Sequence, residues 1–289
     1  ISRHNRARVD LKITGITAEG QTVTITSAAK VPVLINYLCD PYGCIIDMSR
    51  GTGDDTKISG TGPFMVESLT PKEVVLVKNP AYYGGVPKTD RIIVSSITDG
   101  NTLALALQNG EIDAAQGLPY ASLPLFKDSA AYKTSSTDTS RTFLAAFNFN
   151  TPALQDERVR RAVVMSLDKK TFARVQLMGN GIAADGPFPP NLPFGGDKVH
   201  APAYNPQSAR QLLAEAGWTD TDGDGYVDKD GQPLTLRWLT YSFRQELPLL
   251  AEAAQSWLKE TGIRLEINPT DGYADFLRRG EWDIYAKAF

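Results

Sequence analysis

The chain has 289 residues, which suits one large domain or two of ordinary size. Hydrophobic residues make up 42% and charged residues 22%, as in ordinary globular proteins, and the net charge is −3. No basic face with interleaved aromatic residues stands out, so nucleic acid is not expected as a partner. No apolar run approaches the length of a membrane span.

The first half of the chain predicts mainly strands. Residues 9–26 read as a hairpin turning at Glu19-Gly20, and a loop at residues 49–59 is expected to act as a hinge or domain boundary. A helix is expected after Asp99, ended by Gly110. The remaining predicted strands are 64–69, 73–78, 91–96 and 112–115. Strand–helix–strand order indicates an α/β lobe.

The second half predicts alternating strands and helices. A buried strand at 142–147 precedes a helix with Asp156 as N-cap, and Asp168 is expected to cap another helix. Asn205-Pro206 begins a further helix that Gly217 ends. The later predicted elements are strand 234–240, helix 248–260, strand 263–267, helix 273–279 and strand 282–289. This alternation predicts a parallel or mixed sheet covered by helices.

Gly60-Thr61-Gly62-Pro63-Phe64 predicts a tight turn leading into a strand. A phosphate cradle is the alternative, but no Lys-Ser/Thr pair and no helix follow the glycines.

The segment from Asp220 to Asp228 is the sharpest local motif. Asp220, Asp222, Asp224, the Tyr226 carbonyl and Asp228 occupy the positions that supply ligands in the first half of an EF-hand-type calcium loop, and Gly225 stands at the sixth position. The twelfth position is Gly231 and not a bidentate Glu, and a strand is expected next. Two interpretations therefore stay open: a structural Ca²⁺ site, or an acidic Asp-Gly turn without metal.

No catalytic set is evident. The two histidines, His4 and His200, lie at the terminus and in a Pro-rich loop, where solvated side chains are expected.

Asn148 and Asn150 are candidate ligand-binding residues, because amide groups at the end of a strand donate and accept hydrogen bonds. Phe147 and Phe149 flank them. The alternative is that both Phe side chains pack in the core and both Asn side chains bond locally in a turn. Arg141 and Tyr241 are further candidates, chosen for their positions near strand ends.

Several segments, in order along the chain, resemble the family 5 extracellular solute-binding proteins, the dipeptide, oligopeptide and nickel receptors of ABC importers. The similar segments are GTGPF (60–64), VKNPAYYGG (77–85), NTLALALQNGEIDA (101–114), FNFNTPALQDERVRRAVVMSLDKK (147–170) and YNPQSARQLLAEAGW (204–218). The resemblance implies a periplasmic-binding-protein-like α/β fold of class II, with two lobes joined by a hinge and mixed sheets flanked by helices. It assigns residues 1–58 to the tail of an incomplete lobe subdomain, 59–140 to part of lobe 1 and 141–289 to most of lobe 2.

The resemblance also implies what the protein does. We expect a non-enzymatic receptor that captures a peptide, a nickel complex or a similar small polar solute outside the membrane and delivers it to a membrane permease. No cofactor is expected to be required, and Ca²⁺ is one of the two interpretations of the acidic loop given above. The expected location is periplasmic or extracellular, with a lipoprotein anchor as one form. Relatives extend before and after the matched region, so the chain is expected to be a fragment.

Because the family is exported, the cysteines of CDPYGC, Cys39 and Cys44, are expected to form a small-loop disulfide, ahead of two reduced thiols. Two functions from other classes stay as alternatives: a secreted calcium-stabilised hydrolase, and a calcium-dependent interaction module using the acidic loop.

Overall fold

The computed structural model describes residues 11–39, 45–47, 59–127, 129–190 and 192–288. The chain divides into two compact units, Ile1–Asp99 and Gly100–Phe289. Nearly all of the expected hinge loop at residues 49–59 lies outside the described residues. Within the described ranges, no helix has the length and apolar character needed to cross a membrane.

The first unit contains two antiparallel sheets and a short helix. β1 (Ile13–Glu19) and β2 (Thr22–Ser27) form the predicted hairpin, and Gly20 takes a φ of +57° at its turn, a value that glycine adopts without strain. The expected strands at 64–69, 73–78 and 91–96 are confirmed. They form an antiparallel sheet of β3 (Phe64–Leu69), β4 (Glu73–Lys78) and β5 (Arg91–Ser95), while α2 (Leu34–Leu38) lies between the two sheets in sequence.

The glycine-rich turn before β3 is tied to the end of β4. Asn79 donates its Nδ2 to the Gly62 carbonyl at 2.9 Å and its backbone N–H to the Pro63 carbonyl at 2.8 Å. These bonds use the backbone to fix the turn, which agrees with the structural interpretation of this segment.

The second unit begins with three short helices, α3 (Gly100–Gln108), η3 (Tyr120–Ser122) and α4 (Pro124–Lys127). Ala104, Ala106 and Phe126 are buried. The predicted strand at 112–115 is wrong, because these residues form a loop and pair with no strand in the described part of the chain. A short apolar run becomes a strand only when a neighbouring strand accepts its hydrogen bonds.

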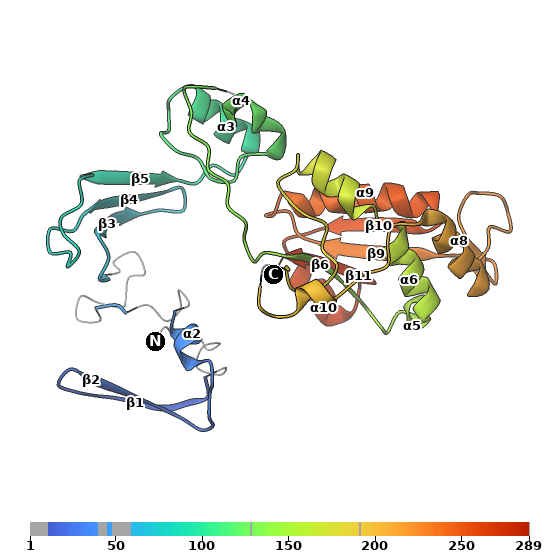
Figure 1. Cartoon of the computed structure of the whole chain (residues 1–289), viewed down its shortest axis with the longest axis horizontal. Coiled ribbons are helices and arrows are strands. Elements are labelled where there is room, and N and C mark those ends of the chain that lie inside the picture. Colours follow the sequence, from blue (N-terminus) through green and yellow to red (C-terminus); the bar gives the residue numbers. More distant parts are fainter. Residues whose placement is uncertain (1–10, 40–44, 48–58, 128, 191, 289) are drawn as a thin grey trace. The chain divides into compact units, whose positions relative to one another are not determined.

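The rest of the second unit is built on a four-stranded sheet in the order β10-β9-β11-β6 (Figure 1). β9 (Thr235–Thr240), β10 (Arg264–Pro269) and β11 (Ile284–Ala288) are parallel, whereas β6 (Phe143–Phe147) runs antiparallel to β11. The expected mixed sheet is confirmed. A two-stranded hairpin, β7 (Asp228–Lys229) with β8 (Gln232–Pro233), follows the acidic loop.

β6 is an edge strand of the sheet, and the expectation that it is a buried strand is wrong. Among the described residues it pairs on one side only, with β11, and Ala145 and Ala146 are exposed. Its apolar composition alone does not distinguish an edge strand from a central one.

Three helices of the second unit begin at the caps that the sequence predicts. Asp156 accepts the Arg158 N–H at 2.9 Å, and Asn205 accepts the Ser208 N–H at 2.9 Å. Asp168 accepts the Thr171 N–H at 2.9 Å, although the α-helix it caps ends after one turn and continues as a π-helix. The helices of this part of the chain are α5 (Pro152–Gln155), α6 (Glu157–Ser166), α7 (Lys169–Thr171), η4 (Phe172–Gln176), η5 (Gly196–Lys198) and α8 (Pro206–Glu215).

Two further helices complete the unit. α9 (Glu246–Glu260) follows β9, and α10 (Tyr273–Arg279) follows β10. Trp238, at 1% exposure, lies in the one large core formed by the sheet with α6, α8 and α9. Tyr273 of α10 packs on Tyr241 and Tyr285, so α10 covers the face on which these two rings lie. The core therefore fixes both the sheet and the loops at its ends.

Candidate functional site

The carboxyl ends of β9, β10 and β11 meet at one edge of the sheet, because these strands are parallel. Open α/β sheets bind their ligands in the crevice outside this edge. Tyr241 follows β9 here. β6 is antiparallel, and its first residue, Phe143, pairs with Ala288, so the start of β6, shortly after Arg141, lies at the same edge. Two of the predicted ligand-binding residues, Tyr241 and Arg141, therefore lie at this end of the sheet. We call it the carboxyl edge, because the parallel strands have their carboxyl ends there.

Aromatic rings line this edge. Tyr241 stacks on Phe243 with centroids 4.2 Å apart and planes at 14°, and it meets Tyr273 at 5.1 Å. Tyr273 in turn stacks on Tyr285 at 5.8 Å, and we call these four residues the carboxyl-edge cluster. Burial, together with the neighbouring phenols of Tyr273 and Tyr241, raises the pKa of Tyr285 to about 12.

Within the cluster, the two stacked rings have different exposures. Tyr241 is 6% exposed and accepts the Ala288 N–H on its hydroxyl at 2.9 Å, whereas Phe243 is 61% exposed. Tyr241 therefore supports the ring that solvent reaches, and Phe243 is the ring that a solute can contact. Phe243 is not among the residues predicted from the sequence, although its place in the loop after β9 was a usable signal.

A second pair at the carboxyl edge also escaped the sequence analysis. Glu246 begins α9 and is 8% exposed, and Tyr120 donates its hydroxyl to Glu246 Oε1 at 2.8 Å. Burial raises the pKa of Tyr120, and the hydrogen bond and charge of Glu246 add to the rise, while the positive charge of Arg141 opposes it. Beside this pair, Gln245 donates Nε2 to the Leu118 carbonyl at 3.3 Å.

The Asn148–Asn150 segment lies at the other end of the sheet. β6 ends at Phe147, which pairs with Ile284 at the start of β11, so the residues that follow lie at the amino edge of the parallel strands. Asn148 is 8% exposed and donates Nδ2 to the Trp282 carbonyl at 2.8 Å, while its Oδ1 accepts the Asn150 N–H at 3.1 Å. The second of these bonds is a local turn bond of the kind that the alternative interpretation expects, whereas the first joins Asn148 to a residue 134 positions away. A ligand-binding role for this segment stays a prediction, and the structure does not bring it together with Tyr241.

The two aromatic neighbours of these asparagines have unequal surroundings. Phe147 packs against the core, whereas Phe149 is 60% exposed and lies under the Arg160 guanidinium, 4.9 Å from the ring centroid. Of these two residues, Phe149 is the one that presents its ring to solvent.

An ion-pair network holds the amino edge together. Asp283 is 4% exposed and accepts hydrogen bonds from the backbone N–H of Arg237 at 2.7 Å, from its guanidinium at 2.9 and 3.0 Å, and from the Thr151 hydroxyl at 2.6 Å. Burial alone raises the pKa of Asp283, but the hydrogen bonds from Arg237 and Thr151 outweigh it and leave the pKa below its ordinary value. This network fixes the strand ends and engages both carboxylate oxygens of Asp283.

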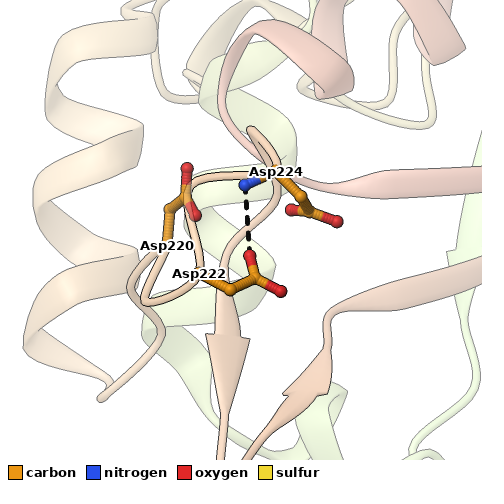
Figure 2. Close-up of side chains that lie close together, drawn as sticks. All are labelled: Asp220, Asp222 and Asp224. Carbon is orange, nitrogen blue, oxygen red and sulfur yellow. Dashed lines mark hydrogen bonds between the residues drawn. The ribbon is translucent and has the colours of Figure 1, made fainter.

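The acidic loop gathers three of its five predicted ligands. Carboxylate oxygens of Asp220, Asp222 and Asp224 lie within 4.8 Å of one another, and all three side chains are exposed (Figure 2). Asp222 Oδ1 accepts the Asp224 N–H at 3.1 Å, as Figure 2 shows, and Asp220 accepts the N–H groups of Gly223 and Gly225 at 2.7 and 3.1 Å. The loop is thus folded by its own carboxylates.

Asp228, the remaining predicted carboxylate, is not part of this cluster. Asp228 begins β7 and accepts the Thr221 N–H at 2.9 Å and the Thr221 hydroxyl at 2.7 Å, bonds that lower the pKa of its carboxyl. The Tyr226 ring lies under the Arg264 guanidinium, 4.3 Å from its centroid, and Arg264 also pairs with Asp224 at 3.2 Å. Calcium binding stays a prediction, with oxygen donors of the kind that Ca²⁺ prefers.

The cysteines and the histidines remain to be placed. Cys39 is exposed, and its expected disulfide partner Cys44 lies outside the described residues, so the disulfide stays a prediction. His200 is exposed, and His4 lies outside the described residues.

Comparison with known proteins gives one consistent result. A family model described as bacterial extracellular solute-binding proteins, family 5, middle region, matches residues 4–289. Among curated relatives, a nickel-binding protein NikA of Staphylococcus aureus is 26% identical over the whole chain, and a nickel-binding periplasmic protein of Escherichia coli is 30% identical over 72% of it. An oligopeptide-binding protein AppA of Bacillus subtilis is 29% identical over 84% of it. The chain spans 57%, 41% and 45% of these relatives' lengths.

Solved structures agree. NikA of Brucella suis in complex with Fe(III)-EDTA matches 99% of the chain with a TM-score of 0.88 at 27% identity, and the chain covers 60% of that protein. NikA of Staphylococcus aureus in complex with Ni(L-His)2 matches 98% of the chain with a TM-score of 0.80 at 27% identity, and the chain covers 58% of it. The expected α/β fold of the periplasmic-binding-protein type is confirmed. The chain belongs to the family 5 bacterial extracellular solute-binding proteins.

Proposed function

We propose that this chain forms part of the substrate-binding component of an ABC importer, which captures a small polar solute outside the membrane and delivers it to the permease. The observation that carries the proposal is the family match over residues 4–289. Relatives named as nickel-binding, oligopeptide-binding and glutathione-binding proteins support the same role.

The proposal includes a non-enzymatic role and an extracellular or periplasmic location. The family consists of extracellular solute-binding proteins, and a lipoprotein anchor belongs to the proposal as one form of attachment. The alternatives of a calcium-stabilised hydrolase and a calcium-dependent interaction module gain no support from the relatives.

We place the solute at the carboxyl edge of the β10-β9-β11-β6 sheet. Phe243 offers an exposed aromatic face backed by the buried Tyr241, and Arg141 offers a guanidinium near the start of β6. A planar aromatic surface and a guanidinium group suit the carboxylate and amide groups of a peptide or of an organic chelator.

If the solute is nickel, we propose that it arrives already chelated. Among described residues, the acidic loop is the one cluster with the geometry to hold a metal, and its three ligands are carboxylates. Carboxylate oxygens suit Ca²⁺ or Mg²⁺, whereas Ni²⁺ is better served by imidazole or other nitrogen ligands, which an organic chelator brings with it. NikA of Staphylococcus aureus was crystallised with such a complex, Ni(L-His)2.

The test is a titration of the protein with Ni²⁺ plus L-histidine, with Ni²⁺ alone, with mixed oligopeptides and with glutathione, followed by calorimetry and by thermal melting. We expect one of these solutes to raise the melting temperature without being consumed. At a concentration a hundredfold above Kd, the bound solute should add about 2.7 kcal/mol to the free energy of unfolding. Chemical turnover of the solute would contradict the non-enzymatic role.

The chain offers a matched pair of variants that locates the site. Phe243 and Phe149 are equally exposed, at 61% and 60%, but lie at opposite edges of the sheet. Phe243→Ala is expected to weaken binding about tenfold or more, as loss of an aromatic contact does, and Phe149→Ala to leave it unchanged. The reverse result would move the site to the Asn148–Asn150 segment.

A further inference from the structure

The start of the second unit contains a small helical body, residues 100–127, that does not share the core of the sheet. Its buried residues, Ala104, Ala106 and Phe126, are absent from the apolar core that holds Trp238 and the strands. Phe126 instead packs edge-on against Tyr132, with ring centroids 5.0 Å apart. The small helical body therefore lies outside the apolar core of the sheet.

The chain between this body and the sheet is exposed. Residues 133–141 contain no helix or strand, and all of them are exposed up to the start of β6. A segment of this kind allows its two ends to move relative to one another, because few buried contacts hold its backbone.

Polar side chains join the small helical body to the sheet side of the unit. Tyr120 donates to Glu246 at 2.8 Å, Gln245 donates to the Leu118 carbonyl at 3.3 Å, and Lys127 donates to Asn180 at 3.2 Å. The Lys127 bond is exposed and therefore weak, whereas Glu246 is 8% exposed. A hydrogen bond to a shielded carboxylate is the strongest of the three.

The Tyr120–Glu246 bond also lies beside the proposed solute position. Glu246 follows Phe243 by three residues in the connection from β9 to α9, at the carboxyl edge. In a protein that closes around its ligand, a bond formed only in the joined arrangement lowers the free energy of closing and so tightens ligand binding.

We propose that Tyr120 and Glu246 form a latch, a pair of positioning residues that holds the small helical body against the carboxyl edge and thereby sets the affinity for the solute. The second part of this proposal rests on the proposed function. The first part, the joining of the small helical body, is measurable without any solute.

The first experiment measures the joining in the solute-free protein. Spin labels at Leu125→Cys and Ile182→Cys, both exposed positions, in a Cys39→Ser/Cys44→Ser background report the distance between the small helical body and the loop after η4. We expect one narrow distance distribution in the parent and a broadened one in Tyr120→Phe and in Glu246→Gln. Matched controls are Tyr132→Phe, which removes a phenol in the same region, and Glu252→Gln, which neutralises an exposed carboxylate on α9. Both controls should keep the parent distribution.

The second experiment measures affinity for Ni²⁺ with L-histidine and for mixed oligopeptides. Loss of one hydrogen bond to a charged group predicts roughly a tenfold weaker Kd in each single variant. The double variant should be no weaker than either single one, because both remove the same bond. Additive losses would contradict the latch.

The outcomes separate the two proposals. If no tested solute binds but the distances change as expected, the latch stands and the proposed function fails. If binding weakens in Tyr120→Phe while its distance distribution stays that of the parent, Tyr120 acts on the solute directly and the latch is overturned.

Discussion

At the scale of single residues, the buried charge of Asp283 is expected to stabilise the fold. It is almost fully buried and accepts four hydrogen bonds, three of them from Arg237. Asp283→Asn keeps the shape but loses the charge, and we expect a loss of about 2 kcal/mol in the free energy of unfolding, measured by urea denaturation at neutral pH. Glu281→Gln, which breaks the exposed pair with Arg279, is the control and should change stability far less.

The same residue predicts a pH dependence. The folded-state pKa of Asp283 lies below its ordinary value, so its stabilisation is fully present above the unfolded pKa of about 3.9 and is lost as the pH falls through the folded pKa. The stability difference between parent and Asp283→Asn should therefore shrink below about pH 4. A difference that stays constant down to acid unfolding would mean that the carboxylate charge is not the cause.

At the scale of elements, the N-cap of α6 is a direct test of the sequence-based helix assignment. Asp156 accepts the Arg158 N–H, and hydrogen bonding by Arg158 lowers the Asp156 pKa to about 2. Asp156→Ala should cost about 1 kcal/mol of stability, and Asp156→Ser much less, because Ser also caps. Equal losses in the two variants would assign the effect to the Arg158 ion pair and not to the cap.

The acidic loop is the second element with a clear test. We expect Ca²⁺ to bind no more tightly than the millimolar range, because Gly231 stands where a bidentate Glu would complete the site and Asp228 is engaged by Thr221. Millimolar Ca²⁺ should then raise the melting temperature, and Asp222→Asn should abolish the rise. Asp230→Asn, outside the cluster, is the control, and no rise in the parent protein would remove the site.

At the scale of the whole molecule, the two units differ in how much they bury. In the β3-β4-β5 sheet, Val75 is buried while Met65, Ile93 and Val94 are exposed, whereas the core around Trp238 includes residues at 0% exposure from several helices and strands. We expect amide hydrogen exchange in β3–β5 to be faster than in β9–β11, because local opening costs less where less apolar surface is buried.

All four tryptophans lie in the second unit, so a second measurement isolates it. Tryptophan fluorescence during denaturation reports the unit that holds Trp218, Trp238, Trp257 and Trp282. Loss of exchange protection in β3–β5 should precede the fluorescence transition. Coincident transitions would show that the two units unfold as one cooperative system.

The sequence by itself determined most elements of this protein. The predicted strands 64–69 and 73–78 matched β3 and β4 residue for residue, and the caps at Asp156 and Asn205 fixed the starts of α6 and α8. These signals are local, since a cap or an alternating strand is encoded within a few residues. The family assignment likewise rests on segments that lie in order along the chain. The division into lobes at residue 141 stays a prediction.

Only the tertiary structure decided which of these elements meet. The antiparallel direction of β6 places Arg141 and Tyr241 at one edge of the sheet and Asn148 at the other. It also made β6 an edge strand and left residues 112–115 without a partner strand among the described residues. The bond between Tyr120 and Glu246 joins residues 126 positions apart, and the network of Asp283 reaches back 132 residues to Thr151. Strand direction and strand neighbours depend on pairing between distant segments, which no local pattern encodes.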